Sequence, residues 1–389
     1  MNIGKIVEKQ ECIGCAACSS ICPVSAIRII VDKKGFYNFE VNDNVCIECE
    51  ACLSVCPVLG EIVREEANVK AYAAWSKRQH VRINSSSGGM FFEIADYVIR
   101  RINGAVYGVL FDDKYYAKYK RVDSENLSEL NNLRGSKYIQ ASMEDIYYQL
   151  ERDIKNAIII FYVGLPCQLA AIKKYIGYKK LNTDSIIMAD LICHGVASLA
   201  IYKMWIDYIG RNRKVKKLLF RDKKNGWKNF SIRIEFWNGD TIIRKHRNDP
   251  FFFGYLKNLY LNNECYSCRF SGFPRQGDIT LGDFWGAPKE IDDDKGISLV
   301  LINNIKAKFL FDQLENIEFK EIDLNYAISK NPMIAVRNIN IPKDRYLIFS
   351  KLLNGKLNYR DLQYLAIKYK IFECIKRVIR RLINLLPVI

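Results

Sequence analysis

The cysteine spacing near the start of the sequence constrains the fold more than any other feature. Residues 12–23 (CIGCAACSSICP) and 46–57 (CIECEACLSVCP) are two copies of Cys-x2-Cys-x2-Cys-x3-Cys-Pro, offset by 34 residues. Three thiolates at this spacing can surround one corner of a 4Fe-4S cubane, while the fourth reaches the neighbouring cluster. The pattern therefore predicts a small two-cluster ferredoxin-like domain over residues 1–60, whose role is electron transfer.

The exchange of the fourth cysteine divides the eight expected ligands into two sets. The first set is Cys12, Cys15, Cys18 and Cys56. The second set is Cys46, Cys49, Cys52 and Cys22. A pair of zinc sites is the alternative, although zinc ribbons do not normally need a doubled third cysteine and a Cys-Pro ending.

Composition indicates a folded, cytoplasmic protein. With 389 residues, 49% of them hydrophobic, the chain is long enough for two or three domains. Its thirteen clustered cysteines indicate metal binding in a reducing compartment, and no apolar run reaches the length of a membrane-spanning helix. The net charge of +16 is uneven, because residues 1–60 carry five Lys and Arg against seven Asp and Glu, whereas residues 351–389 carry nine against two. This asymmetry favours partners of both signs, or serves only solubility.

From residue 69 the pattern changes to that of a mixed α/β domain. Residues 71–75 and 105–110 are typical of strands, and residues 90–101 of a helix between them. Directly before this helix lies a Ser-Ser-Ser-Gly-Gly run (85–89), where hydroxyls and amides at a helix N-terminus would favour phosphate. A simple helix cap is the alternative. A second loop, residues 134–138, adds two cations and an aromatic ring that could hold a pyrophosphate and stack on a flat ring system.

Four further cysteines predict a third cluster. They are Cys167, Cys193, Cys265 and Cys268. The first two follow the predicted strands 157–163 and 185–191, where sites in open α/β sheets tend to lie. The last two form a Cys-x2-Cys pair that needs two partners. The alternatives are a structural zinc with the same ligands, or two unrelated buried thiols beside a Cys-x2-Cys pair.

Seven motifs of the body occur in a characteristic order. They are SSSGG (85–89), RGSKY (134–138), PCQ (166–168), CHG (193–195), RDKKNGW (221–227), CYSC (265–268) and GDITLGDFWG (277–286). Together they resemble the coenzyme F-420 hydrogenase/dehydrogenase beta-subunit family, over residues 69 to about 305. Members are FAD-containing iron–sulfur proteins, and they include deazaflavin-reducing hydrogenase subunits and the reductase of hydroxymethyl chlorophyll. The resemblance implies FAD, and a family cluster on the four cysteines of the body.

The resemblance also implies a set of flavin contacts. By motif they are Ser86, Ser87, Gly88, Gly89, Arg134, Ser136 and Lys137. Two positions depart from the family pattern, since Leu165 stands where a small polar residue is usual and Ala197 replaces a proline. Neither change removes a ligand, but both could reshape the pocket, so the electron acceptor is not inherited with the resemblance.

The expected fold is α+β, in four parts. A ferredoxin-like domain (1–60) precedes a mixed α/β flavin-binding catalytic domain, whose first part is 69–155 and whose second part, 156–330, holds the third iron–sulfur site. A basic helical tail (331–389) follows.

The expected chemistry joins one-electron and two-electron steps. Electrons would arrive singly at the ferredoxin-like domain and pass through the third cluster to FAD, which could deliver a hydride to an organic substrate. His194 is the first candidate for the proton donor, with Lys137, Asp283 and Tyr138 as alternatives. A histidine beside a cluster can also be only a hydrogen-bonding neighbour.

The tail is predicted to form a long helix over residues 361–386. One side would carry Leu362, Leu365, Tyr369, Phe372, Ile379, Leu382 and Leu386, and the other Lys370, Arg377, Arg380 and Arg381. Such a helix could pack on the core, or lie on anionic lipid at the inner membrane face, which would suit a lipid-linked substrate. No basic-aromatic motif accompanies the charge, so nucleic acid is not expected as a partner.

Three functions are compatible with these features. The first is an FAD- and 4Fe-4S-dependent oxidoreductase that acts on a small-molecule or lipid-linked substrate, for instance in surface polysaccharide biosynthesis, and takes electrons from a redox partner such as ferredoxin. The second is an electron-transfer beta subunit of a hydrogenase or dehydrogenase complex. The third is a metal-stabilised interaction module, which would hold zinc and no flavin.

Overall fold

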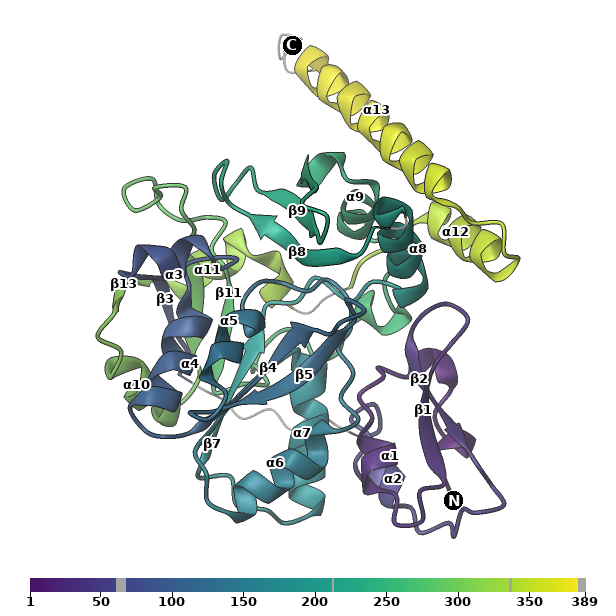
Figure 1. Cartoon of the computed structure of the whole chain (residues 1–389), viewed down its shortest axis with the longest axis vertical. Helices are drawn as coiled ribbons and strands as arrows, with labels where there is room; N and C mark the ends of the chain where they lie inside the picture. Colours follow the sequence, from purple (N-terminus) through teal and green to yellow (C-terminus); the bar gives the residue numbers. More distant parts are fainter. Residues whose placement is uncertain (61–67, 212, 336–337, 384–389) are drawn as a thin grey trace.

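The protein consists of a small N-terminal unit, a larger body and a long C-terminal helix (Figure 1). The computed structural model describes residues 1–60, 68–211, 213–335 and 338–383. Figure 1 shows the N-terminal unit beside the lower part of the body, and the C-terminal helix directed away from the opposite end. This arrangement agrees with the expected ferredoxin-like domain followed by a mixed α/β domain. The charged segment 61–68 between the two units, which the sequence predicts to be a linker, lies almost wholly outside the described residues.

The N-terminal unit repeats one short loop-helix element around a hairpin. Its elements are α1 (Ala17–Ile21), β1 (Ile27–Val31), β2 (Tyr37–Val41) and α2 (Ala51–Ser54). Both helices begin directly after a left-handed residue, Ala16 (φ 60°) or Glu50 (φ 62°), so the two cysteine loops make the same turn. The strands pair antiparallel, and Asp32 closes the turn between them by accepting hydrogen bonds from the amides of Lys34 and Phe36 at 2.9 and 3.0 Å. A tight hairpin around residues 32–35 therefore joins the two halves of the unit.

The body is built on an eight-stranded mixed sheet. In spatial order its strands are β13 (Ile317–Ile322), β3 (Lys70–Ser76), β12 (Ser298–Ile302), β11 (Ile279–Asp283), β7 (Ile186–Leu191), β6 (Ile160–Gly164), β4 (Ala105–Phe111) and β5 (Ala117–Val122). Strands β4, β6, β7 and β11 are parallel, and β3 shares their direction because both β3 and β11 pair antiparallel with β12. The carboxyl ends of five strands therefore meet at one edge of the sheet.

Helices cover both faces of this sheet. Alternate residues of each strand point to opposite sides, so Tyr107 and Tyr162 belong to one core and Val106 and Phe161 to the other. The first core is shared with α6 (Ile146–Lys155) and α7 (Pro166–Tyr178). The second is shared with α4 (Met90–Arg100) and α10 (Ile305–Asp312). The first core also continues into the N-terminal unit, so the two units share one apolar interior.

A second, smaller sheet connects the body to the C-terminal helices. Its strands are β8 (Val215–Asp222), β9 (Ser231–Phe236) and β10 (Thr241–Lys245), and α8 (Leu199–Gly210) and α9 (Pro250–Leu256) pack beside it. The chain then forms α12 (Lys343–Leu353) and α13 (Tyr359–Ile383). Helix α13 begins two residues before the predicted start, and residues 384–386 of the expected helix lie outside the described part. Among the described helices, none combines the length and the apolar composition that crossing a bilayer requires.

The N-terminal unit docks on the body through backbone groups. The carbonyl of Gly35 accepts a hydrogen bond from the amide of Leu199 at 2.7 Å, and the Ser198 hydroxyl donates to the carbonyl of Lys34 at 2.5 Å. Gly35 has φ +82°, and a Cβ atom there would lie 2.3 Å from the backbone nitrogen of Ala200. Only glycine therefore permits this close approach of the hairpin to the start of α8.

Candidate functional site

The outermost cysteines lie on an exposed loop of the N-terminal unit. Cys49 is exposed and Cys46 is half-buried, with the Asn2 amide 3.6 Å from the Cys46 sulfur. Cys52 is buried at the start of α2, where burial raises its pKa and the charge of Cys49 raises it further. Cys22, the fourth member of the predicted set, ends α1 and accepts a hydrogen bond from the amide of Ala26 at 3.2 Å. Cys49 is thus the member of this set that faces solvent.

The other set of the N-terminal unit lies inside, against the body. Burial raises the pKa of Cys18 well above its ordinary value, and the nearby charges of Cys15, Cys12 and Cys56 add to the effect. The structure thus brings the distant Cys56 to the three thiols of the first motif, as the motif spacing predicts. Body side chains hold this loop, since the Tyr147 hydroxyl donates to the carbonyl of Cys15 at 2.7 Å.

The four body cysteines also meet. Burial is the largest cause of the strongly raised pKa of Cys167, followed by the charges of Cys268, Cys193 and Cys265, and then by that of Cys15. The four predicted ligands of the third cluster therefore share one environment beside the inner set of the N-terminal unit. Among the described residues, no group of three or more His, Cys, Asp or Glu side chains is close enough to hold a single ion.

Loop geometry at this site requires glycine. Gly195 has φ +120°, its amide donates to the Cys193 sulfur at 3.2 Å, and a Cβ atom there would lie 3.5 Å from the Cys265 sulfur. The small residue after the Cys-His pair therefore lets the two cysteine segments approach each other.

The carboxyl edge of the large sheet gathers most of the predicted site residues. Cys167 lies in the first turn of α7 directly after β6, Cys193 lies two residues after β7, and Asp283 ends β11. The 85–89 run follows β3 through the short helix α3 (Gln79–Ile83). Because sites in open α/β sheets form at this edge, distant motifs converge there.

The Ser/Gly run is held tightly by the sheet. The Ser87 hydroxyl donates to the carbonyl of Ile297 at 2.7 Å, and the Gly88 amide donates to the Ser298 hydroxyl at 3.0 Å. A Cβ atom on Gly88 would lie 2.4 Å from the carbonyl oxygen of Ala74. Gly89, with φ +95°, is the N-cap of α4. The run is thus both a packed turn and a helix start.

The two loops assigned to the flavin contact each other. The backbone amide and the hydroxyl of Ser136 lie 2.8 and 2.9 Å from the Ser86 hydroxyl. The Arg134 guanidinium lies 4.6 Å from the ring of Phe92, and its Nε and Nη1 are buried without a hydrogen-bond partner in the described structure. Burial, and then the charge of Arg78, lower the pKa of Arg134. Buried donors of a cation fit an anionic group, so these residues suit the pyrophosphate of a dinucleotide such as FAD.

Lys137 has a different environment from Arg134. Its ammonium donates to the carbonyls of Asn132, Leu133 and Arg134 at 3.1, 3.1 and 2.8 Å, at the end of α5 (Leu130–Leu133). Burial lowers its pKa to about 7. All three N–H groups of the ammonium are thus used at the end of this helix. The predicted flavin contact or proton transfer by Lys137 would require the ammonium to give up at least one of these carbonyls.

Comparisons with known proteins match the two parts of the chain separately. Residues 159–325 match the family model for the C terminus of the coenzyme F420 hydrogenase/dehydrogenase beta subunit, and residues 5–63 match the 4Fe-4S dicluster domain. Over these residues the chain is similar to the F420 hydrogenase/dehydrogenase beta-subunit family. The resemblance noted in the sequence is therefore confirmed, together with the iron–sulfur, electron-transfer character of the chain.

A solved structure gives a weaker likeness to this chain. It is from the F420-reducing NiFe hydrogenase complex from Methanosarcina barkeri, studied by xenon derivatisation. Sequence identity is 15% and the TM-score is 0.47, over 72% of this chain and 99% of that chain. The comparison with curated proteins gives no match.

One member of the beta-subunit motif set, Arg221, was not among the predicted site residues. Its guanidinium donates to Asp283 at 2.8 and 3.3 Å, to the Ser86 carbonyl at 3.2 Å and to the Tyr138 hydroxyl at 3.4 Å. The Asp283 charge keeps its pKa raised despite burial, and its Cζ lies 4.1 Å from the ring centre of Phe230. Arg221 thus connects both flavin-assigned loops to the end of β11. The RDKKNGW motif was the sequence feature that could have identified Arg221 as a site residue, because its arginine lies near the end of strand β8.

His194 directly follows Cys193 and lies beside Tyr255. Its ring centre is 4.9 Å from that of Tyr255, whose hydroxyl donates to the carbonyl of Gly195 at 3.0 Å. Asp283 is held by Arg221 and also accepts a hydrogen bond from the Trp227 indole at 3.3 Å. The proton-donor roles of His194 and Asp283 stay predictions.

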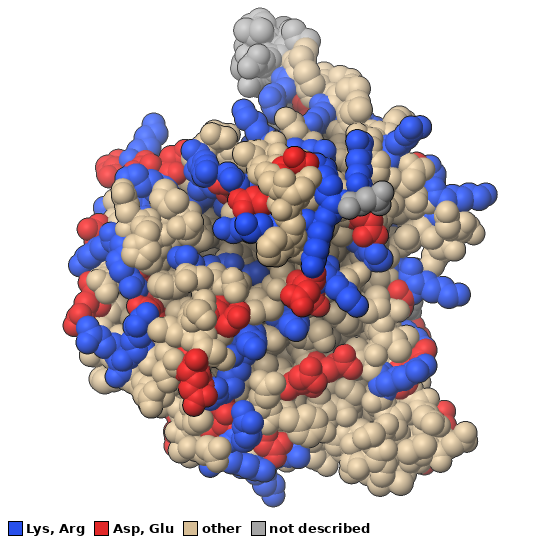
Figure 2. Space-filling view, viewed as in Figure 1, with Lys and Arg blue, Asp and Glu red and all other residues tan. Residues whose placement is uncertain are grey.

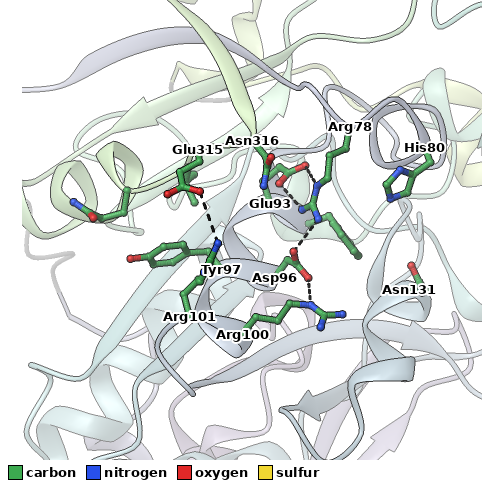
Figure 3. A pocket seen from close by; sticks show the side chains of 13 residues that line it. Arg78, His80, Glu93, Asp96, Tyr97, Arg100, Arg101, Asn131, Glu315 and Asn316 are labelled. Carbon is green, nitrogen blue, oxygen red and sulfur yellow. Dashed lines mark hydrogen bonds and ion pairs between the residues drawn. The ribbon is translucent and has the colours of Figure 1, made fainter.

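Phe92 also lines a charged pocket of about 580 Å3. Figure 3 shows Arg78 between Glu93 and Asp96, and Arg100 directed at Asp96. Arg78 lies 5.5 Å from the Phe92 ring, so this pocket adjoins the Arg134 loop. Its charges are largely paired with one another, and no motif of the sequence assigns a ligand to it.

Proposed function

We propose that the chain is an electron-transfer protein of the beta-subunit type, which binds three 4Fe-4S clusters and FAD and serves a partner oxidoreductase. The observation that carries the proposal is the meeting of Cys167, Cys193, Cys265 and Cys268 beside Cys15. When bound, the clusters would supply single-electron transfer, and FAD would supply the exchange between one-electron and two-electron chemistry.

The chain itself arranges three thiol sets in sequence. In the first set Cys49 is exposed, in the second set Cys15, Cys18 and Cys56 are buried, and the four body cysteines are half-buried. A partner could therefore reach Cys49 directly, whereas the second set lies next to the body cysteines through Cys15. This order fits a relay from a surface cluster through a buried cluster to the body.

The flavin part of the proposal rests on the two connected loops. Ser86, Ser87, Gly88 and Gly89 would present the start of α4, and Ser136 would position Ser86. Arg134 has buried donors without a partner in the described structure, which an anionic phosphate would satisfy. Arg221, held by Asp283, would fix the position of both loops through its contacts with Ser86 and Tyr138.

A self-contained enzyme is the second candidate. It would use the same site to reduce or oxidise a small-molecule or lipid-linked substrate, for instance in surface polysaccharide biosynthesis, with His194, Lys137 or Asp283 as proton donor. The fused ferredoxin-like domain favours this candidate, because it could take electrons from a redox partner such as ferredoxin. Family membership favours the electron-transfer subunit, and we give that function precedence.

Metal analysis of anaerobically purified protein tests the proposal. We expect roughly twelve iron atoms per chain in the wild type and roughly eight in Cys268→Ala, since one four-iron cluster would be lost. The matched control Cys374→Ala changes an exposed cysteine outside the three sets and should leave iron unchanged. A colourless wild-type protein that holds only zinc would refute the redox function. Copurification with a stoichiometric oxidoreductase, against turnover by the isolated chain, separates the two candidates.

A further inference from the structure

Helix α13 packs on the body along its first part. Leu362, Leu365 and Ala366 are buried there, and the Tyr359 ring stacks on Tyr208 with ring centres 3.9 Å apart. Further along, Glu373 pairs with Lys257, the residue directly after α9. Residues 374–379 are exposed, and Figure 1 shows this end of the helix directed away from the body.

A second apolar face runs along the outside of the helix. It comprises Tyr364, Ile367, Ile371, Ile375 and Val378, which are between 49% and 66% exposed. Their spacing of three or four residues places them on one side, opposite the side that Leu362 and Ala366 pack on the body. This face, which we call the outer stripe, differs from the side predicted from the sequence. The predicted side combined residues that pack on the body with residues that do not.

The cations of the projecting half lie away from the outer stripe. Lys376 and Arg377 are exposed, and at helical spacing they fall on the opposite side from Ile371 and Ile375. Arg380 and Arg381 follow in the sequence, and Glu373, the one acid after Asp361, is engaged by Lys257. Figure 2 shows many Lys and Arg side chains near this part of the molecule, whereas the visible face of the N-terminal unit is largely uncharged.

A helix with an apolar face and cations on its other side is best suited to bind an anionic membrane surface. A basic helix with aliphatic residues on one side binds the interface of an anionic membrane, where each cation near the surface adds attraction. A second copy of α13 packed on the stripe would leave these cations unpaired, because the helix has no free acid to form the complementary charge pairs of a stable coiled coil. The charge pattern therefore favours lipid over self-association.

We propose that the outer stripe of α13 lies on an anionic lipid surface and holds the body beside the membrane. The apolar side chains of the stripe would enter the interface, while the long side chains of Lys376 and Arg377, on the polar side of the helix, would extend back toward lipid phosphates. This inference does not depend on iron or flavin.

Vesicle flotation of the full-length protein tests the proposal. The stripe variant is Ile371→Ser/Ile375→Ser/Val378→Ser, and the matched control is Ile305→Ser/Phe309→Ser, which changes two exposed apolar residues of α10. We compare vesicles of phosphatidylcholine alone with vesicles that also contain phosphatidylglycerol. All changed side chains are exposed, so visible absorbance of the clusters should show that each variant stays folded.

The wild type and the control should bind the anionic vesicles and release them as salt is raised. The stripe variant should bind at least about tenfold more weakly, because three apolar side chains no longer enter the interface. Equal binding by the wild type and the stripe variant would overturn the proposal. So would a wild-type dimer in light scattering that binds no vesicles and becomes monomeric in the stripe variant.

Discussion

The docking of the N-terminal unit depends on Gly35, and the substitution Gly35→Ala tests how much docking free energy this glycine provides. An alanine at φ +82° is strained by about 1 kcal/mol. Its Cβ would also lie 2.3 Å from the Ala200 nitrogen and 2.7 Å from the Ser198 hydroxyl oxygen, closer than atoms can approach. Since backbone must move, the hydrogen bonds to the carbonyls of Gly35 and Lys34 would be lost, at about 1 kcal/mol each. The total loss of docking free energy is about 3 kcal/mol.

Gly239→Ala is the matched control. Gly239 also has positive φ (+90°), but no atom lies within 4 Å of the position its Cβ would take, so the strain acts without the clash. Hydrogen exchange at the Leu199 amide, which donates to Gly35, measures the docked interface directly. A loss of about 3 kcal/mol should accelerate its exchange by about two orders of magnitude in Gly35→Ala, and leave it unchanged in the control. Equal exchange in both variants would refute the close-contact argument.

Three further predictions concern single side chains. Cys49→Ser should weaken the exposed outer cluster, seen in electron paramagnetic resonance as loss of the magnetic coupling between the two clusters of the N-terminal unit; an unchanged spectrum would contradict the ligand assignment. Arg134→Met should weaken FAD binding by about tenfold or more in equilibrium dialysis, and unchanged affinity would remove Arg134 from the flavin site. Burial lowers the pKa of His246, so the unfolded protein binds a proton that the folded protein excludes. Its contribution to stability is therefore complete above its ordinary pKa of 6.5 and lost below it. In denaturation at pH 7.5 and 5.5, His246→Phe should lose less stability on acidification than the wild type, and equal losses would contradict the burial argument.

The cysteine sets could be predicted from the sequence because their spacing alone determines their geometry. Cys12, Cys15 and Cys18 belong to one short Cys-x2-Cys-x2-Cys motif, and the second copy of the motif identifies the distant Cys56 as their fourth partner. The four body cysteines were related by elimination and by resemblance, and the structure places them together around Cys167. Local spacing was sufficient for the first inference, whereas the second also needed elimination and the resemblance.

The environments of the basic residues could not be predicted in the same way. Lys137 was assigned to a flavin because it is a cation in a polar loop, yet its ammonium caps the end of α5. Arg221 lies 135 residues from Ser86 and 62 from Asp283, so its partners depend on the order of strands in the sheet. Sequence pattern shows that a charge is present, whereas its partner is determined by tertiary structure.

The C-terminal helix shows the same limit for apolar residues. A helical wheel separates an apolar from a basic side, but it cannot show that the body covers Leu362 and leaves Ile371 exposed. A helix that packs for only part of its length has two apolar faces with different partners. The outer stripe could be distinguished only once the buried side was known.

Docking of the N-terminal unit is coupled to the shape of its cysteine loops. Interfaces between domains of one chain usually allow relative motion. Here the body holds the loops by their backbone: Gln140 donates to the carbonyl of Ile13 at 2.6 Å, and Tyr147 donates to that of Cys15 at 2.7 Å. These carbonyls are in position only when the first motif has the conformation that gathers its thiols. The same contacts that stabilise the interface therefore select the loop conformation competent for cluster binding, and they maintain the separation between Cys15 and Cys167 on which transfer between the two units depends.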